Sequence, residues 1–438
     1  MMRKTAGRTN LPAPDLGYTA AMDRDSEARL RRARDIASQF RLPGPAKVRD
    51  FPEKGNINQQ TYLVEADSTQ YLLQQLNPDV FKQPRAVMEG MISCIRAQNQ
   101  ALLEGRIGRD DEWEPIRLVP ARDGRQYLET PRESGSECWR MMVRIGGARA
   151  FQSLREIPDK GMRVSVAEET GRGLALFGVL TSGMDTSLIT CPLPGYRDTE
   201  LYYNQLLAAL AGARSISEAG PYLPSDPTVR ESNESHFLVR IDPPEYKRRL
   251  EDRQLRPFID TALQNRAFGL TLSRKLKSGE LKRTVVHGDT KLDNFLFSTR
   301  TGRVKALVDL DTIMQHTWLS DWGDMVRSLV NVAGEKEPDL GRIEVDEDVY
   351  KALLRGFLRS ASHARSSEIE LMEDAPRIMA LELGVRFLAD YLRGDTYFRP
   401  APGEARDLNK IRAMVQFRIF EQLENRGRLP RLPIMGSR

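Results

Sequence analysis

The chain has 438 residues, of which 40% are hydrophobic and 29% are charged, and its net charge is +5. This composition is typical of a globular protein with room for more than one lobe, and no apolar run approaches the ~20 residues of a membrane helix. The small, dispersed basic excess argues against a nucleic-acid surface, and three scattered cysteines with four histidines argue against a disulfide framework or a zinc site.

The N-terminal residues 1–24 mix Pro, Gly, Arg and Asp without periodicity, which predicts a disordered lead-in. They contain no apolar segment of the kind found in signal peptides. Together with the sparse cysteines, this predicts a cytoplasmic protein. A helix is expected over 26–40, before the break at Pro43-Gly44-Pro45.

The following region is rich in β-favouring residues and predicts two hairpins, one of them around Asp123-Gly124. An amphipathic helix is expected after Pro84. The expected strands are 47–51, 61–65, 70–76, 116–119, 125–128 and 139–145. Residues 25–146 are therefore interpreted as an N-terminal lobe, rich in strands, with one helix inside it.

The rest of the chain, 147–438, has mostly helical periodicity and is interpreted as a C-terminal lobe. Residues 214–240, rich in Ser, Pro, Gly and Glu, are interpreted as a surface insertion. The expected helices are 164–182, 199–213, 243–276, 348–361, 375–393 and 406–425, with two short apolar strands, 284–286 and 306–308, among them. This order predicts an α+β, two-lobed, protein-kinase-like fold with a β-rich first lobe and a mainly helical second lobe.

The two short strands carry a group of polar residues. The strand 284–286 leads into His287-Gly288-Asp289, and Asn294 follows Asp289 by five residues. The strand 306–308 leads into Asp309, and Asp311 would lie on the same face if the chain were extended. Because Thr301-Gly302 predicts a tight turn between them, we expect the two strands to pair and to bring these side chains together.

This set of side chains suits phosphoryl transfer. A carboxylate can orient an acceptor hydroxyl and accept its proton, while amide and carboxylate oxygens can hold Mg²⁺ against phosphates. Asp289 fits the first role, and Asn294 and Asp309 fit the second. Each could alone be an ordinary turn residue, but the joint pattern favours the catalytic interpretation.

In this pattern the chain resembles the aminoglycoside phosphotransferase/choline kinase superfamily, distant relatives of the protein kinases. The resemblance implies ATP as phosphoryl donor, Asp289 as the catalytic residue, and Asn294 and Asp309 as magnesium ligands. It also implies that residues 25–146 are the nucleotide-binding lobe and residues 147–438 the catalytic and substrate-binding lobe. Asp321 and Asp324 are expected to brace the catalytic loop by accepting hydrogen bonds from its backbone N–H groups, and not to touch the substrate. His287 is expected to shape the same loop.

A closer resemblance, from about residue 36 to 398, is to the N-acetylhexosamine 1-kinases. Its motifs are Gly55-Asn56-Ile57-Asn58, Tyr71-Leu72-Leu73-Gln74-Gln75-Leu76-Asn77, Asp289-Thr290-Lys291, Asp321-Trp322-Gly323-Asp324, Leu381-Glu382-Leu383-Gly384-Val385-Arg386-Phe387 and Gly394-Asp395-Thr396-Tyr397-Phe398. The resemblance implies phosphorylation of the anomeric hydroxyl of an N-acetylhexosamine (GlcNAc or GalNAc) or a related hexosamine, with ATP and Mg²⁺. By the same resemblance, the nucleotide contacts are Gly55, Asn58, Thr61, Gln74 and Glu89, and the sugar contacts are Asp289, Asp311, Arg386 and Tyr397.

Several alternatives stay open at this point. Arg386 could form an ordinary helix ion pair with Glu382 or Asp390, Tyr397 could be a core aromatic residue, and Glu89 could be a solvated helix residue. The acceptor could also be an aminoglycoside, choline or another amino sugar. Gln74 stands where protein kinases carry a lysine, which leaves a nucleotide-binding pseudokinase as a further alternative, and the sequence leaves monomer and homodimer open.

Overall fold

The computed structural model describes residues 16–52, 57–132 and 135–426. These residues form two compact units. One consists of the described residues up to Val80 with Arg117–Arg144, and the other of Phe81–Ile116 and the chain from Ile145 onward. The expected α+β, two-lobed fold is confirmed. No helix in the three described ranges is long and apolar enough to cross a bilayer.

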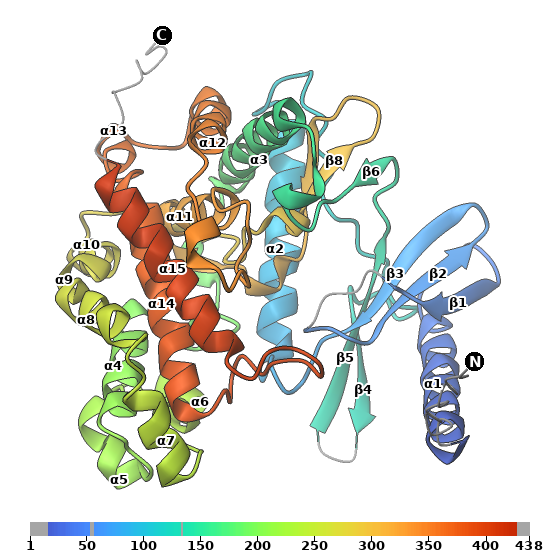
Figure 1. Ribbon diagram of the computed structural model, residues 1–438. Helices are drawn as coiled ribbons and strands as arrows, with labels where there is room; N and C mark the ends of the chain where they lie inside the picture. The colour runs from blue at the N-terminus through green and yellow to red at the C-terminus, as the bar shows by residue number, and fades with distance from the viewer. Residues whose placement is uncertain (1–15, 53–56, 133–134, 427–438) are drawn as a thin grey trace, which may run out of the picture. The chain divides into compact units, whose positions relative to one another are not determined.

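The first unit is built on an antiparallel sheet of five strands in the order β1-β2-β3-β5-β4 (Figure 1). The strands are β1 Ala46–Asp50, β2 Thr61–Ala66, β3 Thr69–Gln75, β4 Leu128–Arg132 and β5 Gly135–Val143. Helix α1 (Leu16–Ala37) packs Ile36 against Val64 and Trp139 of the sheet. Since α1 begins at Leu16, residues 16–24 are helical and not a disordered lead-in, while residues 1–15 lie outside the described part.

The hairpin predicted around Asp123-Gly124 is wrong. The tight turn does form, because the Ala121 N–H donates to the Arg125 carbonyl at 2.8 Å. However, the residues before this turn pair with β5, since the Val119 N–H donates to the Met141 carbonyl at 2.8 Å. The second hairpin of this unit is instead β4–β5, while the other predicted hairpin, 61–65 with 70–76, is confirmed as β2–β3. The sequence predicted the turn correctly, but it could not show that the residues before the turn pair with β5, which lies farther along the chain.

The second unit is mainly helical. Its long helices are α2 Pro84–Leu103, α3 Lys160–Thr181, α4 Thr199–Leu210, α11 Trp318–Leu329, α12 Glu347–Ser360, α14 Asp374–Arg393 and α15 Leu408–Asn425. Its shorter helices include α7 Pro243–Leu250, α8 Arg256–Gln264, α9 Arg266–Gly269, α10 Thr271–Ser278 and α13 Ser366–Ile369, so the single helix expected over 243–276 is broken into four. Helix α2 was expected within the first lobe, but it groups with the second unit, where it packs on α3.

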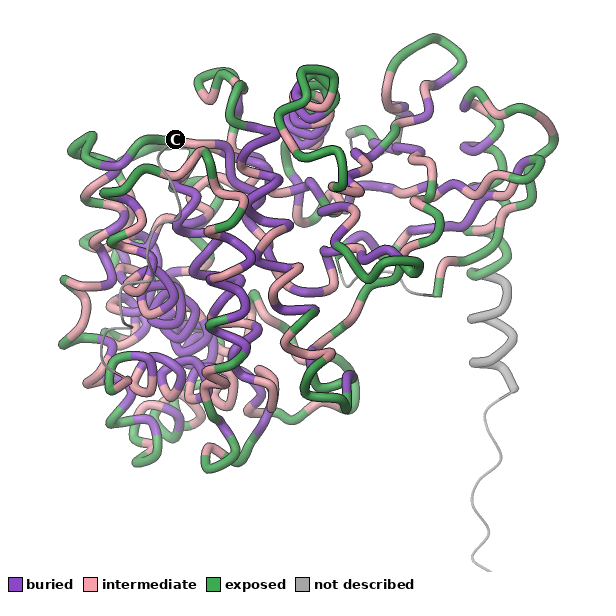
Figure 2. The backbone as a smooth tube through the Cα atoms, turned by 90° about the horizontal axis from the view of Figure 1, so that it is seen from above, coloured by how far each residue is buried: buried purple, intermediate pink, exposed green. Residues whose placement is uncertain are grey.

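The core of this unit surrounds α14, which is buried along most of its length between α4, α11 and α15 (Figure 1). Figure 2 marks the buried residues of the described chain in purple. Helices α3 and α12 approach one another closely. A Cβ added at Gly356 would lie 1.8 Å from the Glu168 carbonyl oxygen, so only glycine allows this packing.

Two small antiparallel sheets position the polar residues noted in the sequence. Strand β7 (Thr284–Val286) pairs with β10 (Met314–His316), and β9 (Val304–Leu307) pairs with β8 (Phe295–Ser298), which also pairs with β6 (Ala148–Arg149). The predicted pairing of 284–286 with 306–308 is therefore wrong, because the chain folds back on itself at Thr301-Gly302 to form β8–β9.

The segment 214–240 is helical and packed and is not a simple surface loop. It contains α5 (Ile216–Ala219) and α6 (Pro227–Asn233). Its side chains Ala219, Phe237 and Leu238 are buried in one cluster with Leu201 and Ala208 of α4. This apolar contact fixes the segment to the second unit.

Candidate functional site

The loop that follows β7 is held by hydrogen bonds to its backbone. The Asp321 carboxylate accepts the N–H groups of His287 (2.6 Å) and Gly288 (2.9 Å), as the sequence predicted. Burial raises the pKa of Asp321 to about 7, although these two N–H donors oppose the shift. Gly288 has φ +84°, and a Cβ there would lie 2.8 Å from the Thr312 carbonyl oxygen, so this position requires glycine.

His287 is a scaffold residue, as expected. The Asp289 N–H donates to its Nδ1 at 3.3 Å, so Nδ1 carries no proton and Nε2–H is left to donate to the Val308 carbonyl at 2.8 Å. Burial lowers the pKa of His287, which favours this neutral form. Both ring nitrogens are therefore occupied, and the ring is not placed to act as a base.

Asp289, Asn294 and Asp309 lie together. Asn294 Nδ2 donates to the backbone carbonyl of Asp289 (2.7 Å) and to its Oδ2 (3.2 Å), which turns Asn294 Oδ1 to the other side of the amide. The Val308 N–H donates to the Asn294 carbonyl at 2.9 Å, which brings the next residue, Asp309, to the same place. Asp309 has φ +65° and ψ +57°, a left-handed conformation that is costly for a non-glycine residue and occurs often at functional sites.

The expectation that Asp311 shares a face with Asp309 is wrong. The chain turns at Asp309 and continues as a 3-10 turn, Leu310–Thr312, so the alternation of an extended strand does not apply. Asp311 is buried, with 3% of its surface exposed.

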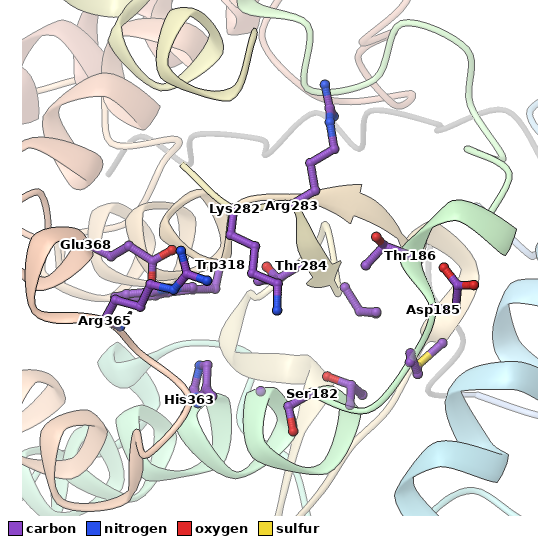
Figure 3. Close-up of a pocket in the computed structure, with 14 residues that line it drawn as sticks. Ser182, Asp185, Thr186, Lys282, Arg283, Thr284, Trp318, His363, Arg365 and Glu368 are labelled. Carbon is purple, nitrogen blue, oxygen red and sulfur yellow. Dashed lines mark hydrogen bonds between the residues drawn. The ribbon is translucent and has the colours of Figure 1, made fainter. Parts of the chain in front are cut away.

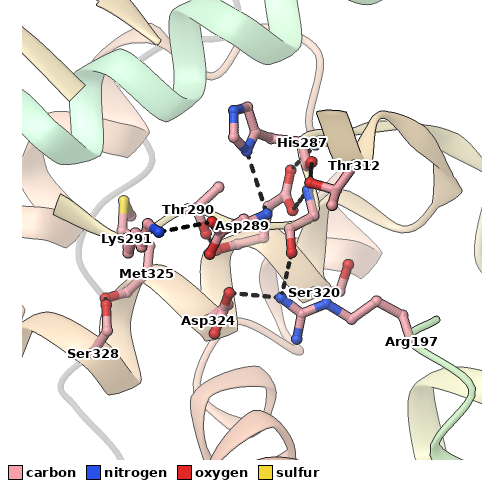
Figure 4. Close-up of polar contacts among 12 residues, drawn as sticks. Arg197, His287, Asp289, Thr290, Lys291, Thr312, Ser320, Asp324, Met325 and Ser328 are labelled. Carbon is pink, nitrogen blue, oxygen red and sulfur yellow. Dashed lines mark hydrogen bonds and ion pairs between the residues drawn. The ribbon is translucent and has the colours of Figure 1, made fainter. Parts of the chain in front are cut away.

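The side chain of Lys291, which had no predicted role, lies beside carboxylates of the catalytic loop (Figure 4). The Lys291 Nζ is 3.2 Å from Asp289 Oδ2 and 3.7 Å from Asp293 Oδ2. Burial alone would lower the pKa of Lys291, but the charges of Asp289, Asp293 and Asp309 outweigh it and raise the pKa. The loop thus concentrates enough negative charge to hold a cation.

Arg386, on α14, lies in a cage of aromatic rings. Its guanidinium carbon is 4.6 Å from the ring centre of Tyr202, 5.2 Å from Phe398, 5.5 Å from Tyr196 and 5.7 Å from Tyr397. Within the part of the chain that the structure describes, Arg386 has no carboxylate partner and makes no hydrogen bond. The rings hold the guanidinium by cation–π contacts and leave its N–H donors for another molecule.

The two carboxylates that could have paired with Arg386 serve other groups. Glu382 accepts from the Thr199 hydroxyl (2.6 Å) and from Arg197 (3.3 Å). Asp390 accepts the N–H groups of Tyr397 (3.0 Å) and of the residue after it (2.7 Å), and so shapes the loop that presents Tyr397. Tyr397 is 45% exposed and is not a core residue. Arg386 therefore forms no ion pair with Glu382 or Asp390, and Tyr397 is not a buried core residue, while the sugar contacts expected for both stay predictions.

The turn before α4 connects Arg386 with the catalytic loop, and sequence analysis missed it. The Tyr196 hydroxyl and Arg197 Nη2 both donate to the Gly288 carbonyl at 2.8 Å. Arg197 also pairs with Asp324 Oδ2 at 2.6 Å (Figure 4), so Asp324 braces the loop through Arg197 and not through backbone N–H groups as expected. No local pattern marks these two residues, because their partners lie about ninety or more positions away.

The predicted nucleotide residues of the first unit form one hydrogen-bonded chain. The Thr61 hydroxyl donates to the Asn58 carbonyl (2.7 Å) and accepts from Gln74 Nε2 (3.1 Å). Gln74 Oε1 accepts from Arg140, a buried cation that the sequence did not single out. Gly55 lies outside the described residues.

Glu89, in the second unit, is exposed on α2. It makes no ion pair with any residue of the described ranges. Its proposed nucleotide role stays a prediction.

A cavity of about 230 Å³ lies elsewhere in the second unit (Figure 3). It is lined by the end of α3, the start of β7, Trp318 and His363, and it contains none of the predicted site residues. The geometry therefore places the candidate site at the loop after β7 and not at this cavity.

Comparison with known proteins agrees with this geometry. Residues 50–368 match the APH phosphotransferase enzyme family. The fold is similar to a microcompartment-associated aminopropanol kinase, with TM-score 0.53 and 14% identity over 90% of this chain and 96% of the other. Two further matches are a choline/ethanolamine kinase family protein from Mesorhizobium loti (TM-score 0.45, 14% identity, 92% and 94% covered) and a spectinomycin phosphotransferase in complex with ADP and spectinomycin (TM-score 0.43, 12% identity, 90% and 98% covered). The chain belongs to the APH phosphotransferase enzyme family and is a small-molecule phosphotransferase.

Proposed function

We propose that the protein is an ATP- and Mg²⁺-dependent kinase that phosphorylates the anomeric hydroxyl of an N-acetylhexosamine or a related hexosamine. Asp289 orients the acceptor hydroxyl and accepts its proton as the new O–P bond forms. We infer the class of acceptor from Arg386, because its guanidinium is surrounded by aromatic rings and forms no ion pair with a carboxylate among the described residues.

The charge of Arg386 bears directly on the acceptor. A protonated amine placed beside this guanidinium would be repelled, and the rings that could stabilise an ammonium group already hold Arg386. A sugar hydroxyl or an acyl carbonyl can instead accept the free N–H donors, and the half-exposed ring of Tyr397 offers a flat face to a sugar. This favours a neutral acylated sugar over choline, an aminopropanol or a polycationic aminoglycoside.

The metal fits the donor set of the catalytic loop. Asn294 Oδ1 and the Asp309 carboxylate are hard oxygen ligands of the kind that Mg²⁺ prefers. The Lys291 ammonium, which pairs with Asp289 and Asp293 of the same loop, supports the proposal of a cation site there. When bound, Mg²⁺ would neutralise charge on the transferred phosphoryl group. The complete set of Asp289, Asn294 and Asp309 also argues against a pseudokinase, which would need none of them for catalysis.

We assign the nucleotide to Asn58, Thr61 and Gln74 of the first unit. Arg140 supports this assignment, because it places a buried guanidinium directly opposite Gln74 on the neighbouring strand. A cation there supplies the positive charge that Gln74 itself lacks.

The proposal is tested by product analysis. The protein is incubated with ATP and Mg²⁺ and with GlcNAc, GalNAc, glucosamine, choline, aminopropanol or an aminoglycoside, and the phosphorylated carbon is located by NMR spectroscopy. The Asp289→Asn protein serves as the control for contaminating kinases. We expect phosphate on the anomeric carbon of an N-acetylhexosamine, with little turnover of the amines.

Three results would contradict the proposal. Preferred turnover of choline, aminopropanol or an aminoglycoside would refute the argument from Arg386. Phosphate at another hydroxyl would refute the predicted orientation of the sugar. Nucleotide binding without turnover of any acceptor would favour a pseudokinase.

A further inference from the structure

We propose that the Tyr196–Arg197 turn is a positioning element for Asp289, because it holds the Gly288 carbonyl while Asp321 holds the Gly288 N–H. The inference rests on the role proposed for Asp289, but not on the identity of the acceptor. It gives a function to a turn that carries no recognisable sequence motif.

The contact controls the peptide plane next to Asp289. The Gly288 C=O and the Asp289 N–H belong to one planar peptide unit. Its oxygen accepts from both Tyr196 and Arg197 at 2.8 Å, and its N–H donates to His287 Nδ1 at 3.3 Å. With both ends of the plane held, the Cα of Asp289 is fixed before a substrate binds.

The turn itself is held under strain. Arg197 has φ +62°, and only 2% of its surface is exposed. A non-glycine residue keeps this conformation only where its surroundings impose it. Here they do so through a hydrogen bond from the Arg197 N–H to the Tyr202 hydroxyl (2.9 Å) and through ion pairs with Asp324 and Glu382.

The segment 214–240 supports the same turn. Asn233 Nδ2 donates to the Pro194 carbonyl at 2.8 Å. Gly195 has φ +82°, and a Cβ there would lie 2.6 Å from a methyl carbon of Leu201, so the turn packs tightly between this segment and α4. The inserted segment therefore acts as the outer brace of the turn.

The test compares two tyrosines that each donate to a backbone carbonyl. Tyr196→Phe removes the bond to Gly288 and keeps the ring beside Arg386. Tyr246→Phe removes hydroxyl contacts to the backbone carbonyls of Ala209 (2.8 Å) and Leu210 (3.2 Å), in a place that touches none of the catalytic residues, and is the matched control. For each protein we would measure kcat, the KM of ATP and of the acceptor, ATP hydrolysis without acceptor, and the thermal midpoint.

We expect Tyr196→Phe to lower kcat about tenfold, the effect of one lost hydrogen bond of ordinary strength, with both KM values within about twofold of wild type. The thermal midpoint should fall no more than in Tyr246→Phe. Arg197→Lys keeps the charge but cannot form the same fork of contacts, so it should lower kcat further and also lower the thermal midpoint.

Two outcomes would overturn the inference. Unchanged kcat in Tyr196→Phe would show that the contact is only structural, and a rise confined to the acceptor KM would make Tyr196 an acceptor ligand. A wrong hexosamine assignment would give a different result, because the wild-type protein would then not phosphorylate hexosamines. Tyr196→Phe and Tyr246→Phe could still be compared on another acceptor or by ATP hydrolysis.

Discussion

Replacing Arg386 by alanine tests how the acceptor is recognised. The side chain makes no ion pair with the described residues, so its removal breaks only the cation–π contacts, worth about 0.5–1 kcal/mol where the group is partly exposed. Folding should therefore change little. A lost hydrogen bond between a charged donor and the acceptor costs about 1.5–3 kcal/mol. Since 1.4 kcal/mol corresponds to a factor of ten, the acceptor KM should rise about 10- to 150-fold.

The assay is steady-state kinetics with acceptor and ATP varied separately, alongside thermal unfolding. Arg377→Ala is the matched control, because Arg377 lies on the same helix, stacks over Phe268 at 4.5 Å and pairs with Asp374 at 3.0 Å. We expect Arg377→Ala to leave both KM values unchanged. The reasoning is refuted if Arg386→Ala raises the KM of ATP as much as that of the acceptor, or if it acts only by destabilising the fold.

Three further predictions concern the loop and its surroundings. Asn294→Ala should raise the Mg²⁺ concentration needed for half-maximal ATP binding by at least about tenfold in a calorimetric titration, because a metal oxygen ligand is lost. Gly288→Ala should lower both the thermal midpoint and kcat, since its Cβ would lie 2.8 Å from a carbonyl oxygen at a positive φ. Glu335→Gln should destabilise the protein at pH 7 but progressively less below about pH 4.5 in urea unfolding. Burial alone would raise the pKa of Glu335, but Arg412 and Arg327 outweigh it and hold the pKa below the ordinary 4.5, so its stabilising charge is lost as acid protonates it.

For each of these three variants, a specific outcome would contradict the prediction. Unchanged Mg²⁺ dependence in Asn294→Ala would remove Asn294 from the metal site. Gly302→Ala is the control for Gly288→Ala, because Gly302 has φ +74° with open space around it, and it should keep full kcat. Equal losses in the two variants would show that backbone strain alone, and not the close contact in the catalytic loop, decides the outcome. A constant stability difference for Glu335→Gln between pH 7 and pH 3 would contradict the predicted titration.

The catalytic residues could be predicted from the sequence because they are local. Asp289 and Asn294 lie within eight residues of the end of β7, and Asp309 directly follows a second apolar segment. An apolar strand followed by polar turn residues can be recognised in the sequence without knowing which strand pairs with it. The partners of these strands could not be predicted, because β8 and β10 have only four and three residues and are too short to show a strand-like alternation of apolar and polar residues.

The contacts around the site could not be predicted, because they depend on long-range packing. Arg197 meets Asp324 across 127 positions, and nothing near either residue marks the pair. Helix α11 was not among the predicted helices. It has only twelve residues, and its polar residues Asp321 and Asp324 are buried, so they do not mark a solvent-facing side. For Arg386, the sequence offered two carboxylates four residues away, and only the structure showed that both are engaged elsewhere.

The most direct test of the catalytic assignment compares Asp289→Asn with Asp293→Asn. Both variants replace one carboxylate that contacts Lys291, at 3.2 and 3.7 Å, so they make the same chemical change within one loop. Phosphoryl transfer and ATP binding would be measured for each. We predict that Asp289→Asn binds ATP normally but transfers phosphate at least about 100-fold more slowly, as expected for loss of a general base, while Asp293→Asn keeps most of its activity. Near-normal transfer by Asp289→Asn would contradict the assignment of Asp289 as the catalytic base.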